Sequence, residues 1–388
     1  MLRRRARLSL SVVNTPERKP LQQAPLFLPA AHLQHLLDAL VRAGFRCIGP
    51  QLRDGAIVYG TLESAAEFPA GIGDIQAPGS YRVSRTAGAR KFAWANGPQA
   101  LKPLLFAPHE DLWHAERRLD GGLEFIPDLP AAGPLAVIGV RACDLAALAM
   151  HDQHFLHGPY PDPCYARRRS ELFLVAVNCT HPAATCFCVS TGDGPRAVGG
   201  FDIALDELND GFVAACGSER AHALLATLDL ARATPEQIAE AQRQSEQAAQ
   251  AQTRHLPSRN LRDALFSNLE HPRWAEVAER CLSCGNCTSV CPTCFCHREQ
   301  EEPGLDGSSS GHAREWNSCF AKDHSFIHGL VFRPDTRTRY RQWLTHKLGG
   351  WHEQFGRSGC VGCGRCVTWC PVGIDITEEA TAICGSPK

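Results

Sequence analysis

The 388-residue sequence lacks several short motifs that mark nucleotide sites and covalent catalysis. No G-x-G-x-x-G follows a predicted strand, which argues against a dinucleotide site of the Rossmann type. A Walker-type phosphate loop is absent, and so is the G-x-S-x-G elbow of α/β-hydrolases. No nickel motif is complete either. We therefore expect any substrate chemistry to belong to other subunits and assign no catalytic residue to this chain.

The sequence also has little net charge and no long apolar run. Lys+Arg total 40 against 41 Asp+Glu, a balance that disfavours a dedicated nucleic-acid or membrane-surface protein. No run approaches the roughly 18 apolar residues that a membrane span requires. The basic N-terminus is followed by an apolar stretch too short and interrupted for a signal peptide. We expect a cytoplasmic protein with no membrane span, no nucleic-acid partner and a disordered basic tail over residues 1–20.

Cysteine, in contrast, is abundant: the chain has 19. Two groups repeat one pattern, C-x2-C-x2-C-x3-C-P, over residues 281–292 and 360–371. This spacing is that of two-cluster ferredoxins, in which three thiolates of one loop bind one cubane and the fourth reaches the other cluster. A zinc site or a disulfide scaffold is the alternative, but zinc sites usually pair one C-x-x-C with a distant C-x-x-C or with histidines. The predicted ligands are Cys281, Cys284, Cys287 and Cys370 for the first [4Fe–4S] cluster, and Cys360, Cys363, Cys366 and Cys291 for the second.

Four further cysteines follow two predicted strands. The apolar runs Leu135–Val140 and Leu172–Val177 enclose a helical segment, and such strand–helix–strand units usually place their strands in parallel. Cys143 and Cys179 then follow the carboxyl ends of two neighbouring strands, which is the edge where ligands bind in α/β sheets. The set of Cys143, Cys179, Cys186 and Cys188 suits a third [4Fe–4S] cluster, although ordinary buried cysteines or one bridged pair remain open.

The pattern of apolar residues predicts two main regions. Residues 21–234 form an α/β domain with a mixed sheet and the third cysteine set, and residues 235–260 form an exposed helical linker. Residues 261–388 form a mainly α-helical two-cluster domain, with a flexible surface loop at 301–311. Three more thiols, Cys294, Cys296 and Cys319, either line the first cluster or ligate an additional group. The first interpretation is favoured, because no fourth cysteine completes a separate site.

Several segments of the sequence resemble those of a known family. The stretches are 280–296 (RCLSCGNCTSVCPTCFC), 339–347 (RYRQWLTHK), 358–375 (SGCVGCGRCVTWCPVGID), 139–144 (GVRACD), Asn178-Cys179 and 185–188 (TCFC). They resemble the β subunit of soluble NAD(P)-linked nickel–iron hydrogenases, the sulfhydrogenases, over roughly residues 25–380. The A subunit of anaerobic sulfite reductase is a related family with the same layout.

The resemblance implies an electron-transfer subunit with [4Fe–4S] clusters in a cytoplasmic complex. Its implied partners are a nickel-bearing large subunit, a small cluster-bearing subunit and a flavin subunit that handles NAD(P). The resemblance also supports the third cluster, on Cys143, Cys179, Cys186 and Cys188. Two other functions stay open: electron supply to a sulfite-reducing enzyme, and a cluster-based redox sensor, for which the sequence shows no output module.

Overall fold

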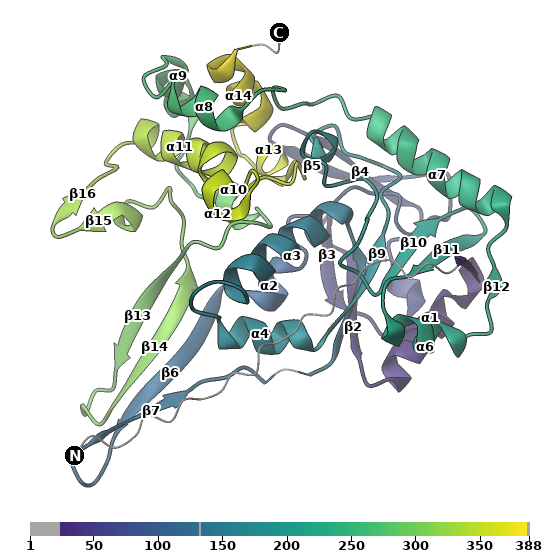
Figure 1. Ribbon diagram of the computed structural model, residues 1–388, viewed down its shortest axis with the longest axis horizontal. Helices are drawn as coiled ribbons and strands as arrows, with labels where there is room; N and C mark the ends of the chain where they lie inside the picture. Colours follow the sequence, from purple (N-terminus) through teal and green to yellow (C-terminus); the bar gives the residue numbers. More distant parts are fainter. Residues whose placement is uncertain (1–23, 132, 386–388) are drawn as a thin grey trace.

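An eight-stranded mixed sheet organises the N-terminal part of the protein (Figure 1). The computed structural model describes residues 24–131 and 133–385, so the predicted tail over residues 1–20 lies outside the described part. The strand order is β12-β1-β11-β10-β9-β8-β2-β3, in which β10, β9, β8 and β2 run in parallel and the remaining pairs are antiparallel. The strands are β1 Leu26–Pro29, β2 Arg46–Arg53, β3 Ala56–Thr61, β8 Leu135–Val140, β9 Leu172–Val177, β10 Ile203–Glu207, β11 Gly211–Cys216 and β12 Ala231–Arg232.

Helices cover both faces of this sheet. On one face α1 (Leu33–Arg42) and α6 (Glu219–Ala226) pack against alternate residues of the central strands, such as Phe173 and Val175. On the other face α3 (Ala142–Phe155) and α4 (Pro163–Ser170) cover the intervening residues, such as Leu174. Strands buried on both faces read as continuous apolar runs, which is why β8 and β9 show no polar alternation. The predicted α/β region and the parallel pairing of β8 with β9 are confirmed.

A second sheet joins distant parts of the chain and was not predicted. Its order is β13-β14-β6-β7, and residues 109–116 pair with residues 309–315. The expected flexible loop at 301–311 is therefore wrong: only residues 304–308 connect the strands there. Strand β13 has the sequence HREQEEP, which lacks the alternation of apolar residues that would predict a strand. Its backbone pairing with β14 holds it in place. The strands are β6 His109–Arg117, β7 Leu123–Pro127, β13 His297–Pro303 and β14 Ser309–Trp316.

Helices dominate the rest of the C-terminal region, as predicted. Their buried faces form one core that includes Trp274, Tyr340, Trp343 and Leu344. Side chains of Asn260, Asp335 and Asp375 accept hydrogen bonds from backbone N–H groups in the first turns of three helices. The elements are α8 Leu261–Phe266, α9 Arg273–Arg280, α10 Asn286–Ser289, α11 Thr336–Thr345, a π-helical turn His346–Gly350, α12 His352–Phe355, α13 Arg365–Thr368 and α14 Ile376–Cys384.

The two regions interlock. The hairpin of β4 (Ile72–Ala77) and β5 (Ser80–Arg85) reaches the second cysteine ladder, where Gly79 N donates to Val367 O at 3.1 Å and Tyr81 stacks on Trp369 with ring centroids 5.0 Å apart. Helix α7 (Pro235–Gln250) links the regions along the sheet, and its inner face is partly buried. No helix in the described ranges is long and apolar enough to cross a membrane. Smaller elements are α2 Lys102–Leu105, α5 Cys188–Thr191, β15 Phe326–Ile327 and β16 Leu330–Val331.

Candidate metal centres

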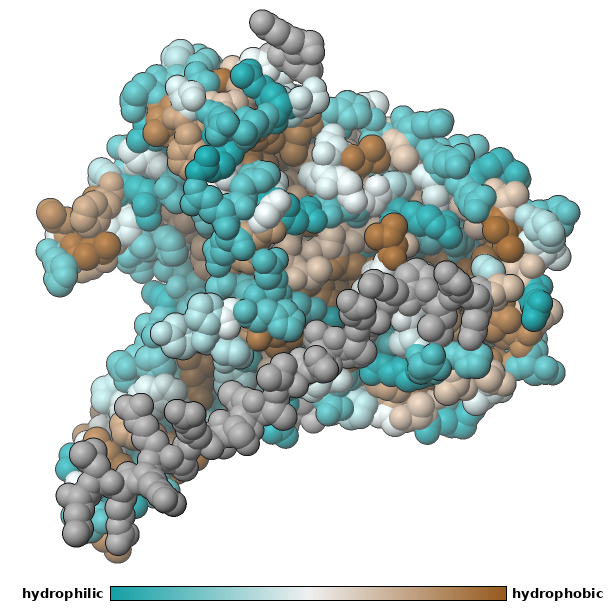
Figure 2. All heavy atoms as spheres, viewed as in Figure 1, coloured by the Kyte–Doolittle hydropathy of each residue, from teal (hydrophilic) through white to brown (hydrophobic). Residues whose placement is uncertain are grey.

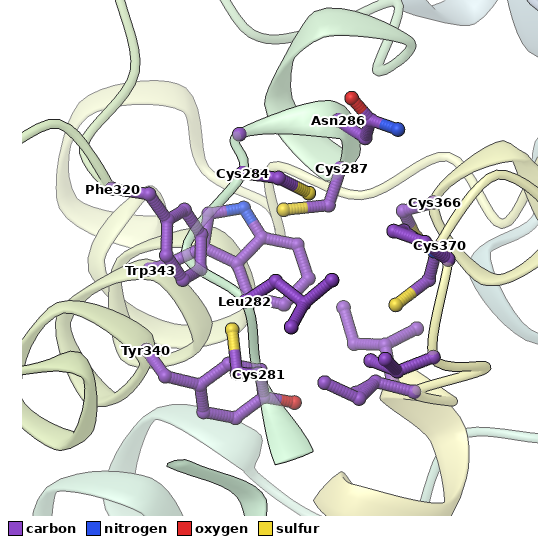
Figure 3. A pocket seen from close by; sticks show the side chains of 15 residues that line it. Cys281, Leu282, Cys284, Asn286, Cys287, Phe320, Tyr340, Trp343, Cys366 and Cys370 are labelled. Atoms are coloured by element: carbon purple, nitrogen blue, oxygen red, sulfur yellow. The ribbon is translucent and has the colours of Figure 1, made fainter. Parts of the chain in front are cut away.

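The first cavity lies where α9 ends. It measures about 460 Å³ including space open to solvent, and Figure 3 shows sulfurs of the ladder loop on one side with Cys370 across from them. Positive φ angles at Ser283 (51°) and Gly285 (77°) wind the loop tightly before α10 begins. The cavity is lined by the four cysteines predicted for the first cluster, Cys281, Cys284, Cys287 and Cys370, together with the rings of Phe320, Tyr340 and Trp343.

The second cavity repeats this arrangement around the second ladder. It measures about 340 Å³ including space open to solvent. Gly362 and Gly364 have φ of 62° and 76°, and each lies so close to the backbone around Thr185–Cys188 that a Cβ would overlap it. The loop can thus press against the neighbouring segment only because these positions are glycine. The lining cysteines are Cys291, Cys360, Cys363 and Cys366, the set predicted for the second cluster.

The third cavity sits at the carboxyl edge of the parallel strands. It measures about 320 Å³ including space open to solvent and is lined by Cys143, Cys179, Cys186 and Cys188. Cys143 lies in the first turn of α3, directly after β8, and Cys179 follows β9, as the strand–helix–strand reading predicts. The buried guanidinium of Arg141 donates to backbone carbonyls, including Ala95 O at 3.1 Å, and so fixes one wall.

Sequence reasoning missed two amides at this third cavity. Gln252 Nε2 lies 3.2 Å from the sulfur of Cys188, and Asn96 Nδ2 lies 3.9 Å from that of Cys186. Asn96 also donates to the carbonyl of Cys363 at 2.8 Å. Both amides come from irregular segments far from the cysteines in sequence, so no spacing signal pointed to them. N–H donors toward cluster sulfurs are among the means by which proteins set cluster potentials.

The three cavities adjoin in series. Cys366 lines both the first and the second cavity, and Cys363 lines both the second and the third. The second cavity is therefore the middle one. The sequence placed the two ladders together through their crossed fourth cysteines, but it gave no position for the third set relative to them.

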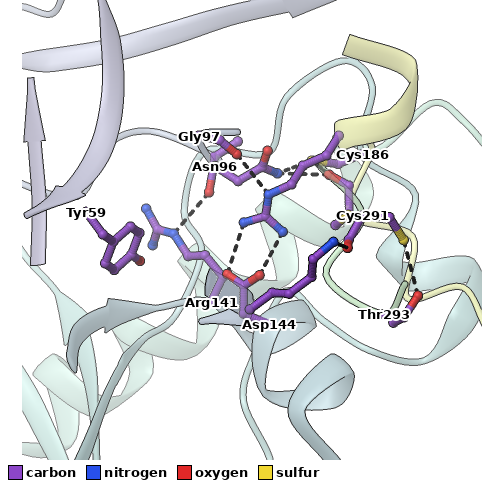
Figure 4. Close-up of polar contacts among 12 residues, drawn as sticks. Tyr59, Asn96, Gly97, Arg141, Asp144, Cys186, Cys291 and Thr293 are labelled. Atoms are coloured by element: carbon purple, nitrogen blue, oxygen red, sulfur yellow. Dashed lines mark hydrogen bonds and ion pairs between the residues drawn. The ribbon is translucent and has the colours of Figure 1, made fainter. Parts of the chain in front are cut away.

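A buried ion pair lies next in sequence to cysteines of the second and third cavities. Arg365 and Asp144 are 1% and 2% exposed and pair through two contacts of 2.7 and 3.1 Å (Figure 4). Arg365 Nε also donates to Gly97 O at 2.8 Å. Burial lowers the pKa of the Arg365 guanidinium, but the Asp144 carboxylate more than offsets it and the pKa is raised. The pair directly follows Cys143 on one side and directly precedes Cys366 on the other, so its charges act on both cavities.

The electrostatics of the cysteines fit metal clusters. Burial raises the pKa of Cys360 and of Cys188 to about 12, so neither sulfur is a thiolate at neutral pH unless a metal stabilises it. Within residues 24–131 and 133–385, no three His, Cys, Asp or Glu side chains converge closely enough for a single ion. One zinc would draw all its thiolates to about 2.3 Å. A cubane needs wider spacing, because each thiolate binds a different iron.

Comparison with known proteins agrees with this chemistry. The family described as a 4Fe-4S dicluster domain matches residues 280–374, which implies two [4Fe–4S] clusters. No solved structure matches the chain. Sulfhydrogenase 2 subunit beta of Pyrococcus furiosus is 34% identical over 253 residues, which cover 64% of this chain and 74% of that protein. The chain therefore belongs to the family of sulfhydrogenase beta subunits, as an iron–sulfur electron-transfer subunit.

Proposed function

We propose that the protein carries one [4Fe–4S] cluster in each of the three cavities and passes electrons along them. The proposed ligands are Cys281, Cys284, Cys287 and Cys370 for the first cluster, Cys291, Cys360, Cys363 and Cys366 for the second, and Cys143, Cys179, Cys186 and Cys188 for the third. The observation that carries the proposal is that successive cavities share a lining cysteine. Cubanes held in this way would be close neighbours, which favours transfer of single electrons between them.

The two ends of this series differ in exposure. Cys284 is exposed, and Leu282 beside it is 63% exposed, so the first cavity lies near the surface. At the other end, Cys143, Cys186 and Cys188 are buried and Cys179 is half-buried. The first cluster is therefore the proposed point at which electrons enter from, or leave to, a partner at this surface.

We further propose that the partners are the other subunits of a nickel–iron hydrogenase complex: a large nickel-bearing subunit, a small cluster-bearing subunit and a flavin subunit that binds NAD(P). The name of the Pyrococcus relative supports this assignment. So does an exposed apolar surface on the β15–β16 hairpin, the brown projection at the left of Figure 2. Its members are Phe326, Ile327, Leu330 and Phe332, each more than half exposed. Exposed apolar groups of this kind mark protein interfaces.

The third cluster is tested by a difference in metal content. Replacing Cys143, Cys179, Cys186 and Cys188 together by Ser should remove about four irons and about four acid-labile sulfides per chain. The matched control replaces Cys47, Cys164 and Cys216 by Ala; these thiols are buried, line none of the three cluster cavities and should leave the metal content unchanged. An unaltered iron content in the quadruple variant would refute the third cluster.

The partners are tested by purifying the native complex under anaerobic conditions. We expect nickel and a flavin to co-purify in fixed ratio with this chain. Replacing Leu330 and Phe326 by Ser should weaken that association while leaving the clusters intact. Co-purification of sirohaem in place of nickel would show that the chain supplies electrons to a sulfite-reducing enzyme.

A further inference from the structure

Two buried aromatic side chains at the first cavity each carry a polar atom that the protein leaves unpaired. Tyr340 and Trp343 lie on α11 and are 2% and 5% exposed. Neither the hydroxyl of Tyr340 nor the indole nitrogen of Trp343 has a hydrogen-bond partner among the described residues. A polar group that is buried without a partner is costly, and native proteins rarely leave one so. Both groups therefore call for an acceptor that the surrounding protein does not supply.

Other buried indoles of the chain show that this combination is selective. Trp274 packs in the same core, but its Nε1 donates to Asn268 O at 2.8 Å. Trp351 and Trp369 also have an unpaired Nε1, yet neither lines one of the three cluster cavities. Among the described residues, an unpaired buried donor in the wall of a cluster cavity is thus confined to the two side chains of α11.

Both side chains face the cysteines of the first ladder. They line the first cavity together with its four proposed ligands. Figure 3 shows the indole nitrogen of Trp343 on the side of the Cys284 and Cys287 sulfurs, and the ring of Tyr340 beside Cys281. Trp343 also lines the second cavity, whereas Tyr340 lines the first alone.

The composition of the cavity walls identifies the missing acceptor. Apart from Asn286, the described residues around the first cavity are cysteine, glycine, proline, aliphatic and aromatic residues. A [4Fe–4S] cubane bound there brings its inorganic sulfides and the cysteine sulfurs, and hydrogen bonds to these sulfurs are one of the factors that set its potential. Such bonds are stronger when the acceptor carries more negative charge.

We propose that the Tyr340 hydroxyl and the Trp343 indole N–H donate hydrogen bonds to sulfur atoms of the first cluster and thereby raise its reduction potential. The reduced cluster has one more negative charge than the oxidised cluster, so each donor favours uptake of the electron. Both residues position the cluster and set its potential without binding iron. The inference rests on the proposed function in placing a cubane in the first cavity, but it does not depend on the third cluster.

The test removes each donor from the full chain and keeps an aromatic ring, in the variants Tyr340→Phe and Trp343→Phe. At a fixed solution potential, the ratio of reduced to oxidised first cluster should fall about threefold to tenfold. This fall corresponds to roughly 30–60 mV in a redox titration of a one-electron couple. Tyr340→Phe should leave the second cluster unchanged. Full iron content with an unchanged potential would overturn this inference, whereas a parent protein in which Cys284→Ala alters no cluster signal would refute the proposed first cluster itself.

The matched controls remove the same donors where a protein oxygen accepts the hydrogen bond. Trp274→Phe removes the indole that donates to Asn268 O, and Tyr165→Phe removes a buried hydroxyl that donates to Asp152 Oδ1 at 2.7 Å. Both controls should leave the potential of the first cluster at the parent value. Shifts of equal size in the controls and the test variants would show that the potential follows general packing, and would overturn the proposal.

A measurement on the unmodified chain covers the case in which a variant does not fold. Trp343 is the tryptophan that lines the first cavity within the described part of the chain. Protein grown with ¹⁵N-indole tryptophan should therefore show a ¹⁵N coupling in the pulsed electron paramagnetic resonance spectrum of the reduced first cluster. The proton of that N–H should exchange for deuterium in D₂O with a matching change in the spectrum. A first-cluster spectrum without the ¹⁵N coupling would overturn the proposal.

Discussion

Replacing Asp144 by Asn is expected to raise the reduction potentials of the proposed second and third clusters. The carboxylate is buried against Arg365, and it lies directly after Cys143, while Arg365 lies directly before Cys366. Asparagine keeps the shape and can still accept a hydrogen bond, but it leaves the guanidinium positive without its counter-charge. A reduced cluster carries one more negative charge than an oxidised one. The unbalanced positive charge therefore stabilises the reduced state.

The size of the shift follows from the position of the pair. Consecutive Cα atoms are 3.8 Å apart, so the Asp144 carboxylate lies within about 8–10 Å of a cubane bound by Cys143. One elementary charge at that distance, with an effective dielectric constant of about 20, changes the energy by about 2 kcal/mol. For a one-electron couple this corresponds to roughly 70–90 mV. The buried pair also contributes to stability, and breaking it costs about 3–5 kcal/mol.

The assay is a redox titration followed by electron paramagnetic resonance. Asp144→Asn should move the two potentials upward, and the double variant Asp144→Asn/Arg365→Gln, in which the site is neutral again, should return them toward the parent values. The matched control is Asp111→Asn, which removes the same charge at a side chain that is 67% exposed. Potentials of the single variant that stay within about 20 mV of the parent, or that fall, would refute the reasoning, given the expected 70–90 mV.

Three further predictions concern single residues. Gly364→Ala should destabilise the fold by about 2–5 kcal/mol, because φ is 76° and a Cβ would overlap the Thr185 carbonyl. Thermal unfolding should show a lower midpoint for the variant, and an unchanged midpoint would contradict the prediction. Burial lowers the pKa of His151 in the folded protein to about 3. As pH falls below about 6.5, this histidine is therefore protonated in the unfolded chain but not in the folded one. The free energy of unfolding should then decline by about 1.4 kcal/mol per pH unit. His151→Gln should flatten this decline between pH 7.5 and 5.5, and an equal decline in both proteins would exclude His151 as its source. Cys284→Ala should remove the signal of the first cluster while the third persists; loss of all clusters would show that the cavities do not assemble independently.

The α/β region and the helical core were accessible from the sequence because each depends on local periodicity. The parallel strands β8 and β9 are continuous apolar runs, and the aromatic residues of α11 recur at helical spacing. The second sheet was not accessible, because β13 and β6 have no apolar face to mark them. Its buried centre is ionic, where Arg314 pairs with Glu110 and Asp162, and ion pairs between distant residues leave no periodic signal.

The ladder cysteines could be predicted from the sequence for a similar reason. Ladder spacing is a local consequence of winding one loop around one cubane, so a cluster on Cys281, Cys284 and Cys287 could be predicted from sequence alone. The order of the cavities depends on tertiary packing, through Gly362 and Gly364 pressed against the segment that carries Cys186. The amide of Gln252 approaches Cys188 from a remote segment, and no spacing rule predicts such a contact.

The most direct measurement is an iron anomalous-scattering map from crystals grown without oxygen. It should place one compact group of iron in each of the three cavities, with the middle group enclosed by Cys291, Cys360, Cys363 and Cys366 and the others on either side of it. A map in which any of these three cavities contains no iron, or in which the groups do not lie in that order, would contradict the account.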